Sequence, residues 1–416
     1  MLFGSSGIRR RYDLSLAELA LSLGSALAAT SSDVVVGMDT RTSGPVLADA
    51  AIAGLLSGGA RVTSGGIAPT PAVAFAARHH DAGLMVTASH NPEEYNGLKV
   101  FNRDGSSFTV PQQEALERGM GSPQGRGWEC QGELEEADLV SGHRDAILEK
   151  RKVSGDLSVV VDCGNGAGSV ITPDLLSRMG IATLPLNCNP SGRFARPSEP
   201  LEEGLGFVAD LVRAGPADCG IVHDGDADRM MAFDGRGRFI DGDRLLVLFA
   251  RYLGAKRVVT TLDASMVIDE IAEVQRTPVG DTQVSARLRE WGDFGGEPSG
   301  AWIFPDHSLC PDGIYAAALF CEMVSEWDVA EELDGIPRYP IVRESRPCDD
   351  AEGTLWRLGA ASPTDGIRRD EEDGWFLIRA SGTEPKVRIT AEGRTPEAAG
   401  RLAEKARGML ERAKSA

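Results

Sequence analysis

The chain lacks the features that would place it in a membrane or stabilise it through covalent cross-links. It contains no run of about 18 apolar residues, the length that a membrane-spanning helix needs. Its first residues form neither the basic patch nor the hydrophobic stretch of a secretory signal. The seven cysteines are scattered and form no C-x-x-C pair, so neither a disulfide framework nor a zinc ribbon is indicated. We therefore expect a cytoplasmic protein.

Positive charge is also scarce. The sequence has 43 basic and 62 acidic residues, and its net charge is −19. It therefore lacks the excess of basic residues that binding to nucleic acids or anionic membranes requires, and neither is an expected partner. No G-x-x-x-x-G-K-[ST] sequence occurs, so the usual phosphate cradle of an ATP-driven kinase is absent. A small molecule remains the expected partner, because an acidic protein can still bind anions locally.

What the sequence does contain is a long-range repeat. At 416 residues it exceeds what one hydrophobic core usually supports, so several domains are expected. Three β-branched runs that end in polar residues predict buried strands, at 33–39, 157–164 and 257–263. Their recurrence at domain-sized intervals predicts three related α/β units.

Each unit also contains an apolar strand that leads through a short polar loop into a second apolar strand. The three polar loops are 87–92, 223–229 and 295–300. The first carries a serine and a histidine, the second three aspartates, and the third a glutamate and a serine. One repeated scaffold whose copies each carry part of a shared site would produce this pattern. An accidental similarity between common strand–loop–strand segments is the alternative.

A shorter tail follows the three units. Paired strands are expected at 375–378 and 386–390, on either side of a polar loop at 379–385. Thr395 and Pro396 have the residue types of a helix start. The tail is therefore predicted to form a small α+β domain. The expected domains are 1–145, 146–246, 247–340 and 341–416.

The aspartates of the second loop suggest a metal site. Asp224, Asp226 and Asp228 alternate with small residues, so their carboxylates can converge on one side of an extended segment. A hard divalent cation such as Mg²⁺ or Ca²⁺ would make such clustering tolerable. An EF-hand is excluded, because Arg229 stands where its glycine is required and Gly235 where its glutamate belongs. A solvated aspartate-rich turn is the alternative.

The tail loop offers groups that suit a phosphate. Arg379 supplies a guanidinium group, Ser381 and Thr383 supply hydroxyls, and Gly382 frees the backbone between them. A plain hairpin turn also uses serine, glycine and threonine, so both interpretations stay open.

Three other segments carry weaker signals. Glu297 and Ser299 can bind sugar hydroxyls, although a Gly-Pro-Ser turn is equally consistent with them. Ser89 lies in a loop after a strand, and catalytic residues are often found in such loops. A serine in a polar loop is nevertheless more often a turn former than a nucleophile. The glycine-rich segment 164–168 predicts a helix entry rather than a dinucleotide site, because the strand at 182–187 lacks the acid that binds ribose.

Taken together and in order, five motifs resemble those of the α-D-phosphohexomutases, and the resemblance spans nearly the whole chain. The motifs are Gly4-Ser5-Ser6-Gly7-Ile8-Arg9, Thr87-Ala88-Ser89-His90-Asn91-Pro92, Asp224-Gly225-Asp226-Ala227-Asp228-Arg229, Gly295-Gly296-Glu297-Pro298-Ser299-Gly300 and Arg379-Ala380-Ser381-Gly382-Thr383-Glu384-Pro385. The resemblance implies an α/β fold, with three related mixed-sheet α/β domains and a smaller α+β C-terminal domain around a central active-site cleft.

The resemblance also implies roles for individual residues. The implied catalytic residues are Ser89, which carries a phosphoryl group, Lys99 as general base, Arg9 and Arg229, which steady the transferred group, and His90. The implied Mg²⁺ ligands are Asp224, Asp226, Asp228 and a phosphoryl oxygen on Ser89. The implied sugar ligands are Glu297 and Ser299, and the implied ligands of the phosphate that does not react are Arg379, Ser381, Gly382 and Thr383.

The implied reaction interconverts hexose 1-phosphates and 6-phosphates through a 1,6-bisphosphate, which also serves as activator. The enzyme would be an isomerase that transfers a phosphoryl group intramolecularly, as a monomer or a homodimer. The Gly-Thr-Glu-Pro ending of the tail loop favours a phosphoglucosamine mutase. A phosphomannomutase or phosphoglucomutase, a metal-dependent sugar phosphatase and a non-catalytic sugar-phosphate binder are the alternatives.

Two positions depart from the family pattern. Arg10 stands where glycine is common, and Ala301 stands where several members have histidine. The backbone approach near Arg9 and one sugar contact therefore do not transfer directly from the family to this chain.

Overall fold

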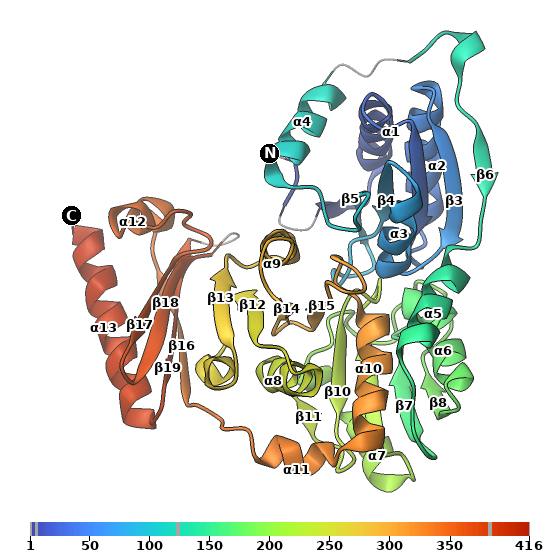
Figure 1. Cartoon of the computed structure of the whole chain (residues 1–416). Helices are drawn as coiled ribbons and strands as arrows, with labels where there is room; N and C mark the ends of the chain where they lie inside the picture. The colour runs from blue at the N-terminus through green and yellow to red at the C-terminus, as the bar shows by residue number, and fades with distance from the viewer. Residues whose placement is uncertain (1, 5–6, 122–124, 382–384, 416) are drawn as a thin grey trace.

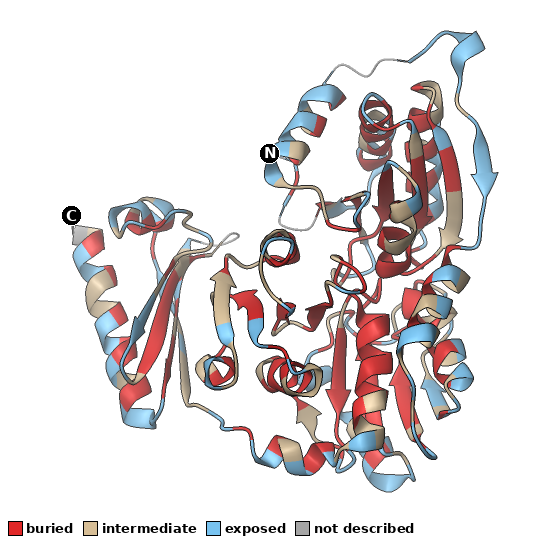
Figure 2. Ribbon diagram, in the orientation of Figure 1, coloured by how far each residue is buried: buried red, intermediate tan, exposed pale blue. Residues whose placement is uncertain are grey.

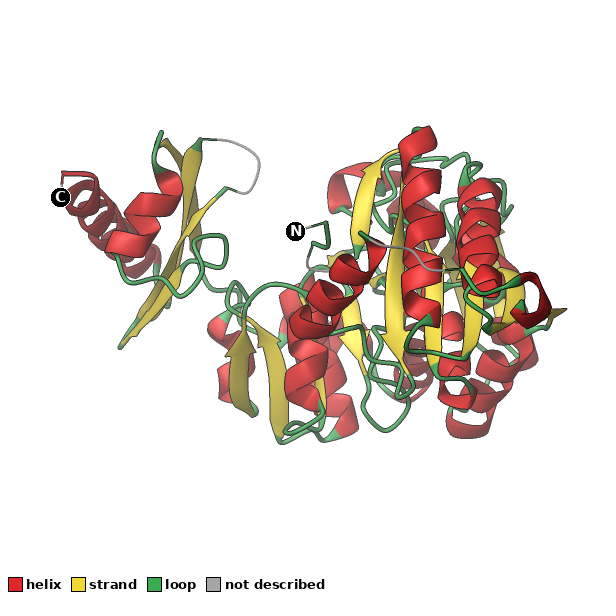
Figure 3. Cartoon of the chain, turned by 90° about the horizontal axis from the view of Figure 1, so that it is seen from above, coloured by secondary structure: helices red, strands yellow, loops and turns green. Residues whose placement is uncertain are grey.

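The computed structural model describes residues 2–4, 7–121, 125–381 and 385–415, which form four β-sheets with helices packed against them (Figure 1). The first three sheets contain both parallel and antiparallel pairs, and the fourth is antiparallel. Seen from above, the fourth sheet and its helices stand to one side of the other three (Figure 3). The predicted fold class is confirmed. No helix within the described ranges is long and apolar enough to cross a membrane.

The elements divide among four domains. The first contains β1 (Ile8–Arg11), α1 (Leu14–Ala28), β2 (Asp33–Met38), α2 (Gly44–Ser57), β3 (Arg61–Ile67), α3 (Thr70–Ala76), β4 (Ala82–Val86), β5 (Tyr95–Asn102), α4 (Val110–Met120) and β6 (Leu134–Glu136), and α5 (Leu139–Lys150) leads out of it. The second contains β7 (Ser158–Asp162), α6 (Thr172–Arg178), β8 (Ala182–Leu186), α7 (Gly206–Ala214), β9 (Cys219–His223), β10 (Met230–Phe233) and β11 (Phe239–Ile240).

The second half of the chain supplies the other two domains. The third contains α8 (Gly242–Leu253), β12 (Arg257–Thr261), β13 (Glu273–Thr277), α9 (Asp281–Leu288), β14 (Phe294–Glu297), β15 (Ala301–Ile303), α10 (Gly313–Glu326) and α11 (Val329–Asp334). The fourth contains β16 (Ile341–Pro347), α12 (Ala351–Arg357), β17 (Ile367–Glu371), β18 (Gly374–Ala380), β19 (Lys386–Gly393) and α13 (Pro396–Ser415). α5 and α8 run through the boundaries expected at 145/146 and 246/247.

The first three sheets share one strand order. The order β5-β4-β2-β3 of the first sheet recurs as β10-β9-β7-β8 in the second and as β15-β14-β12-β13 in the third. In the three sheets β4, β9 and β14 run parallel to β2, β7 and β12, respectively. After each of these strands the chain turns back into an antiparallel neighbour, which is β5, β10 or β15. The repeat predicted from the sequence is thus confirmed, and accidental similarity is ruled out. The three polar loops all lie at the carboxyl ends of parallel strands, where ligands bind in open α/β sheets.

Close helix packing stabilises the first domain. α1 and α2 approach through Gly24 and Gly54, where an added Cβ would lie 2.1 Å from the carbonyl oxygens of Ala51 and Leu21, respectively. The central strands are covered on both faces, as the buried Val34 to Val36 show (Figure 2). Strands buried on both sides have continuous apolar sequences, which is why they could be predicted.

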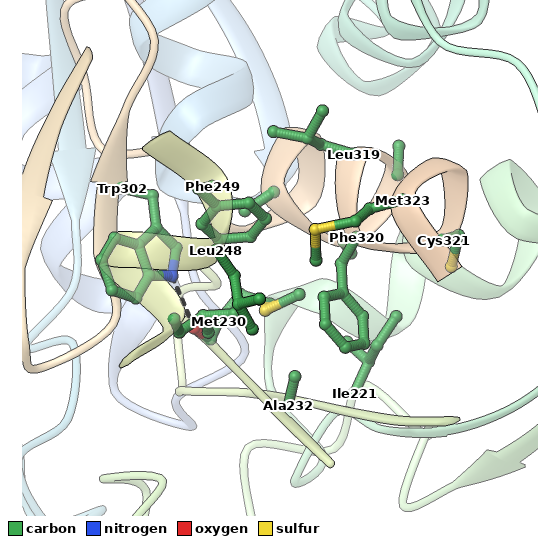
Figure 4. Close-up of a cluster of buried hydrophobic side chains, with 14 of the residues drawn as sticks. Ile221, Met230, Ala232, Leu248, Phe249, Trp302, Leu319, Phe320, Cys321 and Met323 are labelled. Atoms are coloured by element: carbon green, nitrogen blue, oxygen red, sulfur yellow. Dashed lines mark hydrogen bonds between the residues drawn. The ribbon is translucent and has the colours of Figure 1, made fainter. Parts of the chain in front are cut away.

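The second and third domains share one continuous hydrophobic core. Figure 4 shows Ile221 and Met230 of the second domain beside Phe249, Trp302 and Phe320 of the third. The Trp302 indole donates a hydrogen bond of 2.8 Å to the Met230 carbonyl across this boundary. The two loops that these domains carry are therefore held in a fixed relation.

The fourth domain has a separate core and a polar contact with the third. Glu392, only 1% exposed, accepts hydrogen bonds from Ser265 Oγ at 2.6 Å, Met266 N at 2.7 Å and Trp375 Nε1 at 2.6 Å. Arg368 donates to the carbonyl of Leu262 at 2.7 Å. These bonds position the sheet of the fourth domain relative to the third domain.

Candidate active site

Ser89 lies in the β4–β5 loop in a strained conformation. Its φ of 51° falls in the left-handed region that residues with a Cβ rarely adopt, and such strain is typical of functional sites. Its N–H donates to Thr87 Oγ1 at 2.8 Å, and its hydroxyl donates to Asp224 Oδ2 at 2.9 Å. The side chain is buried, with 1% of the residue exposed. The structure thus brings the serine of the first loop against the acidic loop of the second domain.

Arg41 holds the loop of Ser89 from behind. Its guanidinium group is fully buried and donates to the carbonyls of Ser89 and Asn91 at 2.7 Å, Pro92 at 2.6 Å and Tyr95 at 2.8 Å. Its Nε donates to Asp39 at 3.0 Å, so the buried charge is paired. Four carbonyls bound by one planar cation leave the loop little freedom.

In the second domain a buried arginine holds the acidic loop in a similar way. Asp162 ends β7 as Asp39 follows β2, and it accepts from Arg196 Nε at 2.6 Å. Arg196 donates to the His223 carbonyl at 2.6 Å, at the start of the acidic loop. Neither arginine was predicted from the sequence to be a functional residue. The aspartates that follow both predicted strands were the available signal, because a buried carboxylate at a strand end requires a partner.

The three aspartates are buried together, so the alternative of a solvated turn is wrong. Asp224, Asp226 and Asp228 are 1%, 0% and 6% exposed, and one oxygen from each lies within 4.8 Å of the others. Burial raises the pKa of Asp224 well above its ordinary value, and the other two carboxylates add to the rise. Burial also raises the pKa of Asp228, with Asp226 contributing next. The cluster therefore needs positive charge nearby to stabilise its ionised carboxylates.

Lys99 of β5 supplies part of that charge. Its ammonium group lies 2.8 Å from Asp226 Oδ2 and 2.6 Å from Asp228 Oδ2. Burial would lower the pKa of Lys99, but the two carboxylates outweigh it and raise that pKa above its ordinary value. Burial would raise the pKa of Asp226, and Lys99 together with Thr70 lowers it instead. In this state Lys99 is a cation rather than a proton acceptor.

The donor set suits a divalent cation. Asp226 Oδ1 and Asp228 Oδ1 are shielded from solvent and have no hydrogen-bond partner among the residues that the structure describes, while their Oδ2 atoms face Lys99. A buried carboxylate oxygen without a partner is costly, and carboxylate oxygens are preferred ligands of Mg²⁺. The loop is shaped for this arrangement, because Ala227 takes a φ of 55° between the two aspartates.

Basic residues line a cavity beside Ser89. Arg9, His90, Arg229 and Glu199 lie at a cavity of about 310 Å³ that also reaches the loop of the third domain. Arg229 Nη1 lies 3.3 Å from Glu199, and Arg9 Nη1 lies 3.4 Å from the Asn91 side chain. Burial lowers the pKa of His90 to about 3, with Arg229 and Arg9 adding to the effect, so this imidazole is neutral at pH 7. Arg9 and Arg229 are the groups of this cavity that can bind an anion, and the carboxyl groups of Glu199, Asp263 and Glu297 also line it.

Glu297 and Ser299 line the same cavity. Glu297 accepts from the Gly280 N–H at 2.7 Å and from Ser299 Oγ at 3.3 Å. Burial raises its pKa to about 7, and Asp281 adds to the rise. The departure at Ala301 lies next to this pair, since Ala301 is the buried strand partner of Glu297. Arg10, the other departure, is exposed on β1.

The tail loop borders a second cavity, of about 430 Å³, between the third and fourth domains. Arg379, Arg343 and Arg388 line it, and it shares Asp263 and Pro298 with the first cavity. Ser381 Oγ is shielded from solvent and has no hydrogen-bond partner within the described part of the chain. Gly382 and Thr383, also predicted to bind phosphate, lie outside the described residues. The two cavities together extend from His90, the neighbour of Ser89, to a second group of arginines.

Family models match almost the whole chain. They are described as phosphoglucomutase/phosphomannomutase alpha/beta/alpha domain I, matching residues 1–124, domain II, matching 141–237, domain III, matching 241–339, and the C-terminal domain, matching 342–409.

Relatives agree with this match. A protein of Methanocella arvoryzae named "Probable phosphoglucosamine mutase" is 45% identical, over 99% of this chain and 98% of its own. One of the same name from Methanosarcina acetivorans is 44% identical, over 94% and 95%. A phosphoglucomutase/phosphomannomutase family protein of Burkholderia thailandensis superposes with a TM-score of 0.88 at 28% identity, over 99% and 97% of the two chains. The chain belongs to the phosphoglucomutase/phosphomannomutase family.

Proposed function

We propose that this protein is a phosphoglucosamine mutase, which interconverts glucosamine 6-phosphate and glucosamine 1-phosphate. The chain is an intramolecular phosphotransferase by its family, and relatives that are 41–45% identical carry the name of this enzyme. The observation that carries the proposal is the contact of Ser89 Oγ with Asp224, at 2.9 Å, beside two carboxylate oxygens to which no other described residue donates a hydrogen bond. A nucleophile placed against a cation site suits phosphoryl transfer.

We infer that Asp224, Asp226 and Asp228 hold Mg²⁺, together with one oxygen of a phosphoryl group on Ser89. When bound, the ion offsets the roughly −1.5 to −2 charge of a phosphoserine and polarises its phosphorus. The carboxylates and the serine already converge without it. Lys99 can then act as proton acceptor only when the two aspartates turn from its ammonium group, because both raise its pKa in the present arrangement.

The residues that line the first cavity indicate how the phosphoryl group is transferred. A hydroxyl of the bound sugar phosphate attacks the phosphorus on Ser89 and gives its proton to the Lys99 amine in its neutral form. The Ser89 Oγ–P bond breaks as the sugar O–P bond forms, and the Ser89 oxygen takes up a proton, so that none is gained or lost overall. The product is a 1,6-bisphosphate, which turns over and returns its other phosphoryl group to Ser89. Arg9 and Arg229 border the cavity where this charge develops and would stabilise it. Added bisphosphate therefore acts as an activator by restoring the phosphoserine.

The remaining groups orient the sugar. Glu297 and Ser299 offer an acceptor and a donor to its hydroxyls on the wall of the first cavity. Arg379 and Ser381, with Gly382 and Thr383, would bind the phosphate that does not react, since planar guanidinium groups bind phosphate bidentately. Holding a phosphate at one end while transferring at the other permits the same site to bind both monophosphates.

The proposal is tested by Ser89→Ala with Ser15→Ala, an exposed serine, as matched control. Ser89→Ala should lose conversion of glucosamine 6-phosphate to the 1-phosphate, and Ser15→Ala should retain it. Release of inorganic phosphate equal to substrate loss would indicate a phosphatase instead. Tight binding without turnover in millimolar Mg²⁺ would indicate a binding protein. Preferred turnover of mannose or glucose phosphates would retain the mechanism and replace the sugar.

A further inference from the structure

A second group of metal-ligating side chains lies outside the candidate active site. His143 on α5 and His307 and Asp312, from the segment between β15 and α10, are 0%, 1% and 1% exposed. His143 Nε2 lies 2.7 Å from Asp312 Oδ2, and His307 Nε2 lies 3.4 Å from the same oxygen. Two imidazole nitrogens thus converge on one carboxylate oxygen, in a region that the proposed reaction does not use.

The hydrogen bonding of this cluster is incomplete. His143 Nε2 can donate to Asp312, but His307 Nε2 is shielded from solvent and, among the described residues, has only its 3.4 Å ion-pair contact with the same Asp312 oxygen and no regular hydrogen bond. A buried nitrogen of this kind has lost its hydrogen bonds to water without gaining a hydrogen bond of good geometry from the protein. It points toward the oxygen that His143 already uses. The cluster therefore has capacity for a further group between its three members.

Neighbouring residues hold the three ligand atoms in place. Asp312 caps α10 by accepting from the Tyr315 N–H through Oδ1 at 2.8 Å, so only Oδ2 faces the imidazoles. The His307 ring is stacked between Phe75 and Tyr315, with centroid separations of 5.3 and 4.4 Å. Partners that orient ligands in this way are general features of metal sites.

We propose that His143, His307 and Asp312 bind a transition-metal ion of the Zn²⁺ type. Two imidazole nitrogens and one carboxylate oxygen form a donor set that suits Zn²⁺ rather than Mg²⁺. Tetrahedral coordination at zinc bond lengths separates ligand atoms by about 3.3 Å. Ligand atoms of all three residues lie within 4.8 Å of one another, so small side-chain movements suffice. As the ion binds to His143 Nε2, the proton of that nitrogen moves to Nδ1, so the imidazole stays neutral and no proton is lost from it.

The ion would have a structural role behind the acidic loop. His143 lies on the helix that leads into the second domain, and Asp312 begins a helix of the third. Gly313, the next residue, packs so closely under the acidic loop that an added Cβ would lie 2.4 Å from the Arg229 carbonyl oxygen. Zn²⁺ at this position would fix the start of α10 beneath the aspartates and join the two domains.

The test uses the full-length protein, stripped of metal by a chelator and kept in excess Mg²⁺ to occupy the aspartates. Wild type should take up one equivalent of Zn²⁺, measured by elemental analysis after dialysis, and its melting temperature should rise. His143→Gln and His307→Gln should weaken Zn²⁺ binding by at least the roughly 10–100-fold that loss of an outer-shell partner causes. His79→Gln, at an exposed histidine, should bind as wild type does.

X-ray absorption at the zinc edge of wild type provides a measurement that needs no variant. Two nitrogen ligands in the shell of the bound ion support the proposal, whereas an all-oxygen shell overturns it and assigns the ion to the aspartates. Absence of Zn²⁺ uptake in excess Mg²⁺ also overturns it. The cluster would then be a hydrogen-bonded contact between domains. Zn²⁺ uptake by both histidine variants at wild-type affinity would have the same consequence.

Discussion

Replacing Arg41 by alanine should release the loop of Ser89. Arg41 is the fully buried cation that donates to four carbonyls of residues 89–95 and to Asp39. Removing one partner of a buried ion pair costs about 3–5 kcal/mol, because the other charge stays buried without a partner. The lost bonds to carbonyls belong to the same group, so their energies cannot simply be added to this figure.

This cost is local and can be measured as local opening. At about 1.4 kcal/mol per factor of ten, a loss of 3 kcal/mol corresponds to a roughly 100-fold fall in hydrogen-exchange protection of the loop amides. The Ser89 N–H, bonded to Thr87 Oγ1, and the Tyr95 N–H, bonded to the Pro92 carbonyl, are suitable reporters. Amides of the fourth domain, which has a separate core, should exchange as in wild type.

Arg41→Lys separates charge from geometry. An ammonium group keeps the charge beside Asp39, but it has three donors instead of five and cannot hold four carbonyls in a plane. We expect kcat to fall about 100-fold in Arg41→Lys, since a small misplacement of the reacting group has this effect. Arg11→Ala, at an exposed arginine of β1, is the control. Unchanged loop exchange in Arg41→Ala, together with wild-type kcat in Arg41→Lys, would refute this reasoning.

Two further predictions concern charge in the site. Because burial raises the pKa of Glu297 to about 7, kcat/KM should fall as pH decreases through 7, and this limb should vanish in Glu297→Gln. The raised pKa also means that ionisation of Glu297 opposes folding, so wild type should lose stability as the pH rises from 5 to 8. The melting temperature of Glu297→Gln relative to that of wild type should therefore increase over this range, and a constant difference would contradict the assignment. Asp226→Asn should raise the Mg²⁺ concentration for half-maximal activity about tenfold or more, whereas an unchanged Mg²⁺ requirement would exclude Asp226 as a ligand.

Much of the fold could be predicted from the sequence because the repeated strands are buried on both faces. Continuous apolar runs such as Val34 to Val36, followed by polar residues, mark such strands without any knowledge of their partners. The shared core of the second and third domains could not be predicted. It depends on contacts such as Trp302 with Met230, which are 72 residues apart, and local periodicity contains no information about such pairs.

The residues of the candidate site also divide into those that could be predicted from the sequence and those that could not. Ser89, the three aspartates and Glu297 stand in loops that, taken singly, are also compatible with ordinary turns, and they could be selected because five such motifs occur together in the order of one family. Arg41 could not, because an arginine near a strand end resembles any surface arginine until its four carbonyl partners are seen. The His143 cluster was missed for the same reason, since its members come from two distant segments.

The central claim is that Ser89 carries the phosphoryl group. The most direct measurement is the intact mass of the protein before and after incubation with glucose 1,6-bisphosphate and Mg²⁺, followed by peptide mapping. We predict that wild type gains one phosphoryl group on Ser89 and that Ser89→Ala gains none. A phosphoryl group mapped to another residue, or no gain in a wild type that still converts the sugar phosphate, would contradict the account.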